Sequence, residues 1–221
     1  MDSAAETLKA AGISVSTNFL DPHSVPGRVP HDVPESPVHH IIEVAQAQAN
    51  TLVMMGTHGR SDMGRWVIGS VTDKVLHAID TPLLIVRCKE EPSAPVDAKL
   101  ESIIVPLDGS EIAERILPHA VSISKALAIP IRLISVIPSD QSHAHEEDHL
   151  RQQGERLVAQ GAHSAIPRVA HGEAAHAIVE LTNEFPNAFV AMTPHAGPVW
   201  DAGSWAALPT GWCATPLARF W

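Results

Sequence analysis

The sequence has little of what secreted, membrane-spanning or nucleic-acid-binding proteins use. Only Cys88 and Cys213 are present among 221 residues, so we expect no disulfide framework and a reducing, cytoplasmic compartment. Lys and Arg number 15 against 25 Asp and Glu, without a basic block, which argues against binding of nucleic-acid phosphates. No apolar run reaches about 18 residues, so no membrane span is expected. The first residues, "MDSAAETLKAAG", lack the basic start and apolar core of a signal peptide.

Several catalytic and nucleotide fingerprints are missing as well. The chain has no G-x4-G-K-[ST], no G-x-G-x2-G and no G-x-S-x-G, which excludes a P-loop, a dinucleotide-binding turn and a nucleophile elbow. What the chain does have is 45% apolar residues, enough for real hydrophobic cores. Its length suits one large domain or two small ones.

The chain repeats itself at an offset of 137 residues. Residues 38–58 and 175–195 agree at seven of 21 positions, where about one or two matches would arise by chance. The identical pairs are His39/His176, Ile41/Ile178, Glu43/Glu180, Asn50/Asn187, Val53/Val190, Met55/Met192 and His58/His195. A repeat of this length indicates a tandem duplication of a whole folding unit rather than a solenoid.

The second copy alternates strands with helices. Short runs rich in Ile and Val predict buried strands, and apolar residues spaced three to four apart predict helices. Strands are predicted at 100–107, 131–137, near 163–169 and 188–192, with a closing "TPLARFW", and helices at 110–128, 146–161 and 173–185. This alternation predicts a parallel sheet with helices on both faces.

The first copy begins late. The expected order is a helix at 1–11, a strand at 13–20, a Pro-rich loop at 21–37, a helix at 38–49, a strand at 51–55, a glycine segment, a helix at about 69–79 and a strand at 82–87. Nothing in it corresponds to 100–137. We therefore expect a partial domain at 1–88, a polar linker at 89–99 and a second domain at 100–221.

The glycine segment "MGTHGRSDMGRWVIGSV" (55–71) is the strongest functional signal. Gly56 is expected to follow a strand directly, at the C-terminal end where ligands of parallel sheets bind. Glycine allows a sharp turn there, and Gly59 allows backbone to approach a ligand closely. Gly69 and Ser70 then open a helix, whose free N–H groups attract phosphate. The alternative is a set of ordinary turn glycines followed by a helix cap.

Gly56-x2-Gly59-x9-Gly69-Ser70 resembles the nucleotide motif of the universal stress protein (UspA) family. Residues 69–87 and 102–117 resemble that family's closing helix and strand and its opening strand and turn. The resemblance implies two tandem Rossmann-like α/β domains with parallel sheets, the first lacking its opening strand–helix–strand. It also implies non-catalytic binding proteins, often dimeric, that act in stress responses. Some members lack the motif and bind no ATP, so a nucleotide-free interaction module is the alternative.

The resemblance also implies a set of ligand-binding residues. An ATP or related nucleotide would be held by Met55, Gly56, Gly59, Gly69, Ser70, Val71 and Asp108. In the second copy, Thr193 and Ala196 replace the first two glycines, and only Gly203-Ser204 survives. Neither half therefore carries a complete site, and Asp108 is more readily interpreted as a turn and cap residue.

A rival motif stands at 142–150, "SHAHEEDHL". His143, His145, Asp148 and His149 resemble the H-x-H-x-D-H zinc motif of metallo-β-lactamase-type hydrolases, although the spacing is one residue too long. The alternative is a helix start, where acidic residues are favoured by the helix dipole.

Two expectations concern assembly. The apolar strand at 82–87 should pair with the matching strand of another domain, either within this chain or in a homodimer. The strand at 13–20 should lack a neighbour, which favours an upstream segment of about 40 residues, comparable to 100–137, having been lost.

Overall fold

A computed structural model describes residues 6, 8–10, 12–16, 37–58, 70–88, 99–138, 144–193 and 217–219. Its helices are α2 (Pro37–Gln46), α3 (Ser70–Ala78), α4 (Glu111–Glu114), α5 (Leu117–Leu127), α6 (Ala144–Ala159) and α7 (Ala174–Glu184). Its strands are β1 (Val53–His58), β2 (Leu83–Cys88), β3 (Ser102–Pro106), β4 (Ile131–Ile137), β5 (Ala165–His171), β6 (Ala188–Met192) and β7 (Leu217–Arg219). Among the described helices, none has both the length and the apolar character needed to cross a bilayer.

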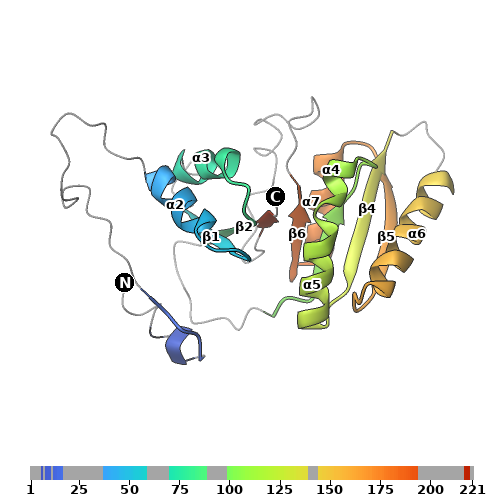
Figure 1. Cartoon of the computed structure of the whole chain (residues 1–221). Helices are drawn as coiled ribbons and strands as arrows, with labels where there is room; N and C mark the ends of the chain where they lie inside the picture. Colours follow the sequence, from blue (N-terminus) through green and yellow to red (C-terminus); the bar gives the residue numbers. More distant parts are fainter. Residues whose placement is uncertain are drawn as a thin grey trace, which may run out of the picture.

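All seven strands form one sheet in the order β1-β2-β7-β6-β3-β4-β5 (Figure 1). The strands of the second copy, β3 to β7, are mutually parallel, and so are β1 and β2 of the first copy. The two groups meet where β2 pairs with β7 in the antiparallel sense. The α/β class and the parallel sheet of the second copy are as the sequence predicts.

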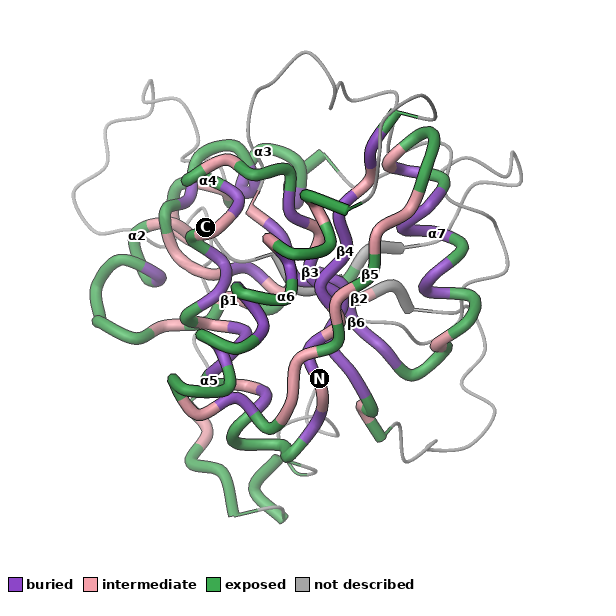
Figure 2. Tube along the Cα trace, turned by 90° about the vertical axis from the view of Figure 1, so that its right-hand side faces the viewer, coloured by how far each residue is buried: buried purple, intermediate pink, exposed green. Residues whose placement is uncertain are grey.

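The second copy packs helices on both faces of its sheet. Ile103 and Val105 of β3 belong to a core cluster with α5 and α6, whereas Ile104 between them belongs to a second cluster under α7. Successive residues of a strand point to opposite faces, so strands covered on both faces need continuous apolar runs. Residues 102–105 of β3 are buried without interruption. Figure 2 shows this buried centre, with exposure increasing toward the helices.

The first copy has one well-covered face. α2 and α3 pack against β1 and β2 in a cluster built on Val75, Leu76, Leu83 and neighbours. On the opposite face, Leu84 packs against the α5 and α6 cluster of the second copy. Its register partner Met54 lies on the same face and is 64% exposed. The second copy therefore covers only part of that face.

The pairing expected of strand 82–87 is confirmed within this chain. β2 aligns with the closing strand of the second copy, with Leu83 opposite Arg219 and Ile85 opposite Leu217. The closing strand of each copy would otherwise leave a row of unpaired N–H and C=O groups. The antiparallel joint pairs Leu83–Ile85 of one row with Leu217–Arg219 of the other.

Other predictions are corrected. No strand forms at 13–16, the described part of the strand expected at 13–20. An extended segment needs a neighbour to form a ladder, and the sheet gives it none. The single helix expected at 110–128 is two helices, α4 and α5, because Pro118 lacks an N–H and suits only the first turn of a new helix.

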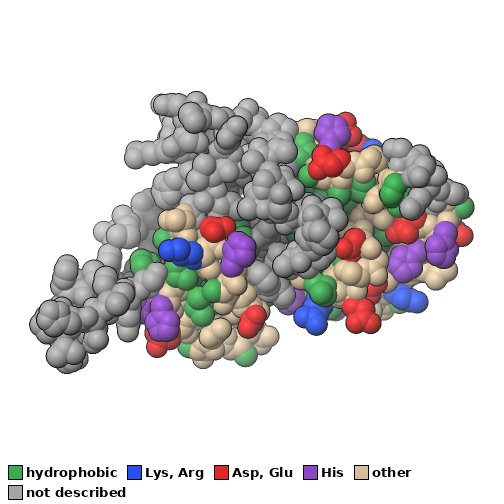
Figure 3. Space-filling model, turned by 90° about the horizontal axis from the view of Figure 1, so that it is seen from above, with side chains coloured by type: hydrophobic (Ala, Val, Ile, Leu, Met, Phe, Trp, Pro, Cys, Tyr) green, Lys and Arg blue, Asp and Glu red, His purple; other side chains and the backbone are tan. Residues whose placement is uncertain are grey.

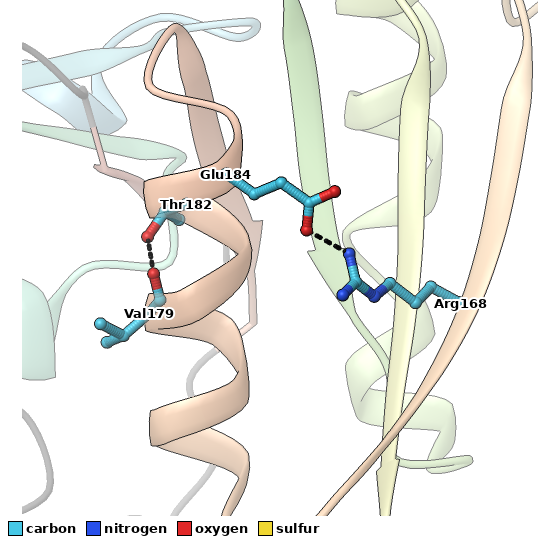
Figure 4. A network of polar contacts seen from close by, with 4 residues as sticks. All are labelled: Arg168, Val179, Thr182 and Glu184. Carbon is cyan, nitrogen blue, oxygen red and sulfur yellow. Dashed lines mark hydrogen bonds and ion pairs between the residues drawn. The ribbon is translucent and has the colours of Figure 1, made fainter.

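A polar group supports α7 against β4 and β5 (Figure 4). The Arg168 guanidinium donates to the Glu184 carboxylate, and both side chains are half-exposed. The Arg132 guanidinium lies 3.4 Å from the ring centroid of Phe185. Burial lowers the pKa of Arg132, and the nearby negative charge of Glu184 opposes that shift. These contacts are structural, at the helix end that precedes β6.

Candidate functional site

Gly56 lies inside a strand. It is the fourth residue of β1 and pairs with Val86 of β2, so β1 continues two residues beyond it to His58. The positive-φ glycines of the described chain are Gly12, Gly109, Gly161 and Gly172, so Gly56 makes no left-handed turn. The prediction that Gly56 directly follows the strand is therefore wrong, because the ladder with β2 continues through it.

The far end of the glycine segment is a helix start. Ser70 is the first residue of α3 and is exposed, and Val71 packs against the same core cluster as Met55. Gly59 and Gly69 lie outside the described residues. The carboxyl end of β1 and the amino end of α3 thus bracket residues 59–69, and a shared core holds both.

The start of α3 has a mixed electrostatic character. Its first N–H groups have no partner within the helix and carry the positive end of the dipole. Asp73 lies in this first turn, with its Oδ1 3.7 Å from Nδ1 of His77. The described surface seen from above carries acidic and His side chains among separate Lys and Arg groups (Figure 3). Backbone dipoles, rather than a dense basic patch, would therefore have to attract an anion.

Asp108 serves the turn after β3. Its Oδ1 accepts from the Ser110 N–H at 3.0 Å, and Ser110 Oγ accepts from the Ala113 N–H at 3.1 Å, which caps α4. The side chain hydrogen-bonds its own backbone two residues on, as turn-forming aspartates do.

Asp108 and Gly56 lie far apart. β2, β7 and β6 separate β1 from β3, four steps of about 4.8 Å or roughly 19 Å in all. The antiparallel joint also reverses direction, so the carboxyl ends of β1 and β3 lie at opposite ends of the sheet. The structure brings Met55, Gly56, Ser70 and Val71 into one region and leaves Asp108 outside it.

In the sequence, Thr193 is notable only as the residue that replaces the first glycine of the motif in the second copy. It follows β6 at the position that matches Gly56, and its Oγ1 is buried without a hydrogen-bond partner among the described residues. The signal available in the sequence was a hydroxyl side chain at a position where the first copy has glycine.

The predicted metal residues are only partly described. His143 lies outside the described residues, and His145, Asp148 and His149 fall in the first two turns of α6. The Asp148 carboxylate lies 3.0 Å from the Arg151 guanidinium. The described residues contain no group of three or more side chains arranged to hold a metal ion.

Part of the sequence resembles a known protein family. Residues 2–87 match the model of the Universal stress protein family. This match covers 86 of the 221 residues of the chain. Universal stress protein MJ0577 of Methanocaldococcus jannaschii is 30% identical over 53 residues, which cover 24% of this chain and 33% of that protein. The chain thus matches about a third of the length of this curated relative.

Solved universal stress proteins share the fold. One from Archaeoglobus fulgidus DSM 4304 has a TM-score of 0.70 at 21% identity, covering 99% of this chain and 75% of that one. Another from Archaeoglobus fulgidus, solved in complex with dAMP, has a TM-score of 0.45 at 17% identity and covers 55% of this chain and 98% of that one. The first similarity shows the fold alone, and the TM-score of the second is too low to support a conclusion.

Proposed function

We propose that this protein is a universal stress protein that binds ATP or a related nucleotide through the backbone of residues 56–70. The observation that carries the proposal is the bracketing of the glycine segment by β1 and α3. A segment that leaves a strand and enters a helix presents N–H groups to a phosphate, and glycines permit close approach. The match to the family model over 2–87 supports the same assignment.

The proposed site should hold phosphates more firmly than the base. β1 is the last of the described strands of the sheet, so beyond its outer edge no described strand is present to carry the ribose and the base. Binding then depends on the phosphate charges, which are the same for every nucleoside triphosphate, and on the backbone N–H groups of the protein. We expect ATP and GTP to bind within about tenfold of each other, and AMP to bind more weakly than either because it carries fewer phosphate charges.

The proposal is tested by native mass spectrometry of the purified protein and by calorimetry with ATP, GTP and AMP. Gly69→Val should abolish binding, because a branched side chain blocks backbone approach. Gly203→Val is the matched control, since it changes the corresponding glycine of the second copy, and should leave binding unchanged. Equal ATP binding by wild type and Gly69→Val would refute the assignment.

A second candidate is a nucleotide-free interaction module of the same fold. The end position of β1, which leaves no described strand on its outer side to carry the base and ribose, favours it. It predicts no co-purified nucleotide and no heat of binding with any of the three ligands.

On either proposal, the protein acts by binding and not as an enzyme. The metal-dependent hydrolase ranks third, and metal content after purification distinguishes it. The cytoplasmic location and the homodimer expected from the sequence stay predictions.

A further inference from the structure

Arg132 of β4 carries a guanidinium group with unused hydrogen-bond donors. Its Nε is buried and has no hydrogen-bond partner among the described residues. The guanidinium carbon lies 3.4 Å from the centroid of the Phe185 ring, a contact that positions the side chain without satisfying its N–H groups. Burial lowers the pKa of Arg132, and the opposing charge of Glu184 offsets this only in part. The positive charge is therefore incompletely compensated, which favours a bound anion.

A second guanidinium lies on the same face of the sheet. Register partners share a face, and so do residues two apart in a strand. Ile134 is the partner of Arg168, so Arg132 and Arg168 both face the side that α7 covers. A strand spacing of about 4.8 Å and a rise of about 3.3 Å per residue place their Cα atoms roughly 8 Å apart. Two arginine side chains can meet one ligand across that distance.

Glu184 leaves donors free on Arg168. The carboxylate accepts a single hydrogen bond, from Nη1 of Arg168 (Figure 4). That bond does not engage Nε or Nη2 of Arg168. In the part of the chain that the structure describes, the Glu184 carboxylate pairs with Arg168 and not with Arg132. Two positive groups thus share one negative group, and positive charge is in excess.

The group is accessible from solvent. Ile166, the register partner of Arg132, is 41% exposed on the same face. The side chains of Arg168 and Glu184 are each 50% exposed. β5 is the last described strand at this end of the sheet, so a small ligand can approach from its side.

We propose that Arg132 and Arg168 bind a phosphate group, either inorganic phosphate or the phosphate of a small monoester. A guanidinium presents its donors in a planar fork that matches phosphate oxygens. A tetrahedral phosphate has oxygens to spare for a second guanidinium, whereas a planar carboxylate is filled by one fork. The terminal nitrogens of Arg132 make the contact, and the stack on Phe185 keeps them in place.

This site is separate from the proposed nucleotide site. Five steps of the sheet lie between β1 and β4, roughly 24 Å at about 4.8 Å each. Arg132 is the second residue of β4, near its amino end, whereas Asp108 follows the carboxyl end of the parallel strand β3. Occupation of one site therefore does not require the other.

The test is titration of the full chain with inorganic phosphate at constant ionic strength, followed by NMR of the arginine Nε–H groups. The Arg132 signal is identified by its loss in Arg132→Lys. In wild type it should shift with a Kd on the order of 1 mM. Acetate should bind at least about tenfold more weakly than phosphate. Glycerol phosphate separates the two sources: equal affinity assigns a monoester, and no binding assigns inorganic phosphate.

Calorimetry of variants measures what each charge contributes. Arg132→Gln should weaken phosphate binding about tenfold or more, and Arg132→Lys about threefold or more, because lysine lacks the planar fork. Glu184→Gln keeps an acceptor for Arg168 and removes the opposing charge, so binding should strengthen about two- to fivefold. Arg151→Gln is the matched control, since Arg151 is a half-exposed arginine paired with Asp148 on α6, and should have no effect.

The wild-type NMR titration stands alone should Arg132→Gln fail to fold. Three results would overturn the proposal: no saturable shift of the Arg132 signal, acetate binding as tightly as phosphate, or a folded Arg132→Gln that binds like wild type. Loss of binding in Arg151→Gln would also overturn it. Gly69→Val should leave the Arg132 titration unchanged, so failure of the nucleotide proposal and failure of this one are distinguishable.

Discussion

Two threonines in the second copy, Thr182 and Thr193, differ in how their buried hydroxyls are satisfied. Thr182 Oγ1 donates to the Val179 carbonyl at 2.7 Å (Figure 4), whereas Thr193 Oγ1 has no partner among the described residues. Replacement by valine keeps the shape and removes the hydroxyl. Thr182→Val should lose about 1 kcal/mol of unfolding free energy, and Thr193→Val should gain up to about 1 kcal/mol. Urea unfolding of the two variants checks the contrast, and equal destabilisation would contradict it.

The acid in the first turn of α3 bears on the proposed nucleotide site. Asp73 places a negative charge where a phosphate would bind and lies beside His77 instead of a strong cation. Asp73→Asn removes that charge with little change in shape, so we expect ATP affinity to rise about two- to fivefold. Calorimetry at low ionic strength measures it. Asp80→Asn, just beyond the end of α3, is the control and should have no effect.

Among the elements, α4 depends most on its cap. Its four residues leave few internal hydrogen bonds, and Ser110 Oγ accepts from the Ala113 N–H. Ser110→Ala should therefore lower the unfolding free energy by about 1 kcal/mol. Ser122→Ala, whose hydroxyl is exposed and bonds the Pro118 carbonyl, should change it by less than about 0.5 kcal/mol. Thermal unfolding of the pair tests the difference, and equal shifts would argue against the cap.

Much of the element order could be predicted from apolar periodicity. The strands at 131–137 and 188–192 begin and end at the predicted residues, because both are buried runs bounded by Pro130 and Asn187. α2 and α7 begin at Pro37 and Ala174, 137 residues apart, which is the offset at which the sequence repeats.

What the sequence could not supply was the relation between distant strands. Periodicity cannot tell whether an apolar strand at 82–87 meets a parallel or an antiparallel neighbour. That choice decides that Asp108 and Gly56 face opposite ends of the sheet. The extent of β1 past Gly56 also depends on its ladder with Val86, a contact that no local pattern encodes.

At the scale of the whole molecule, β7 connects the two copies. The backbone N–H and C=O groups of Leu83 and Ile85 in β2 point toward β7 in the antiparallel ladder, whereas those of Leu84 point toward β1. Deleting residues 217–221 should raise amide exchange at Leu83 and Ile85 by about tenfold or more, while Leu133 in the core stays protected.

A chain lacking residues 1–5 is the matched control for this deletion, and its exchange at Leu83 and Ile85 should equal that of the full chain. Unchanged exchange after removal of 217–221 would mean that β7 contributes nothing to holding β2.

The central place of β7 in the sheet has a consequence for biosynthesis. Arg219 leaves the ribosome 131 residues after Cys88 (219 − 88). At translation speeds of about 5–20 residues per second, this delay is roughly 7–26 seconds. Hairpins close in about 1–10 microseconds, so β2 waits far longer for its partner than folding itself would take. Throughout that interval the nascent first copy exposes an apolar strand edge, and any slowing of the ribosome lengthens the exposure in direct proportion.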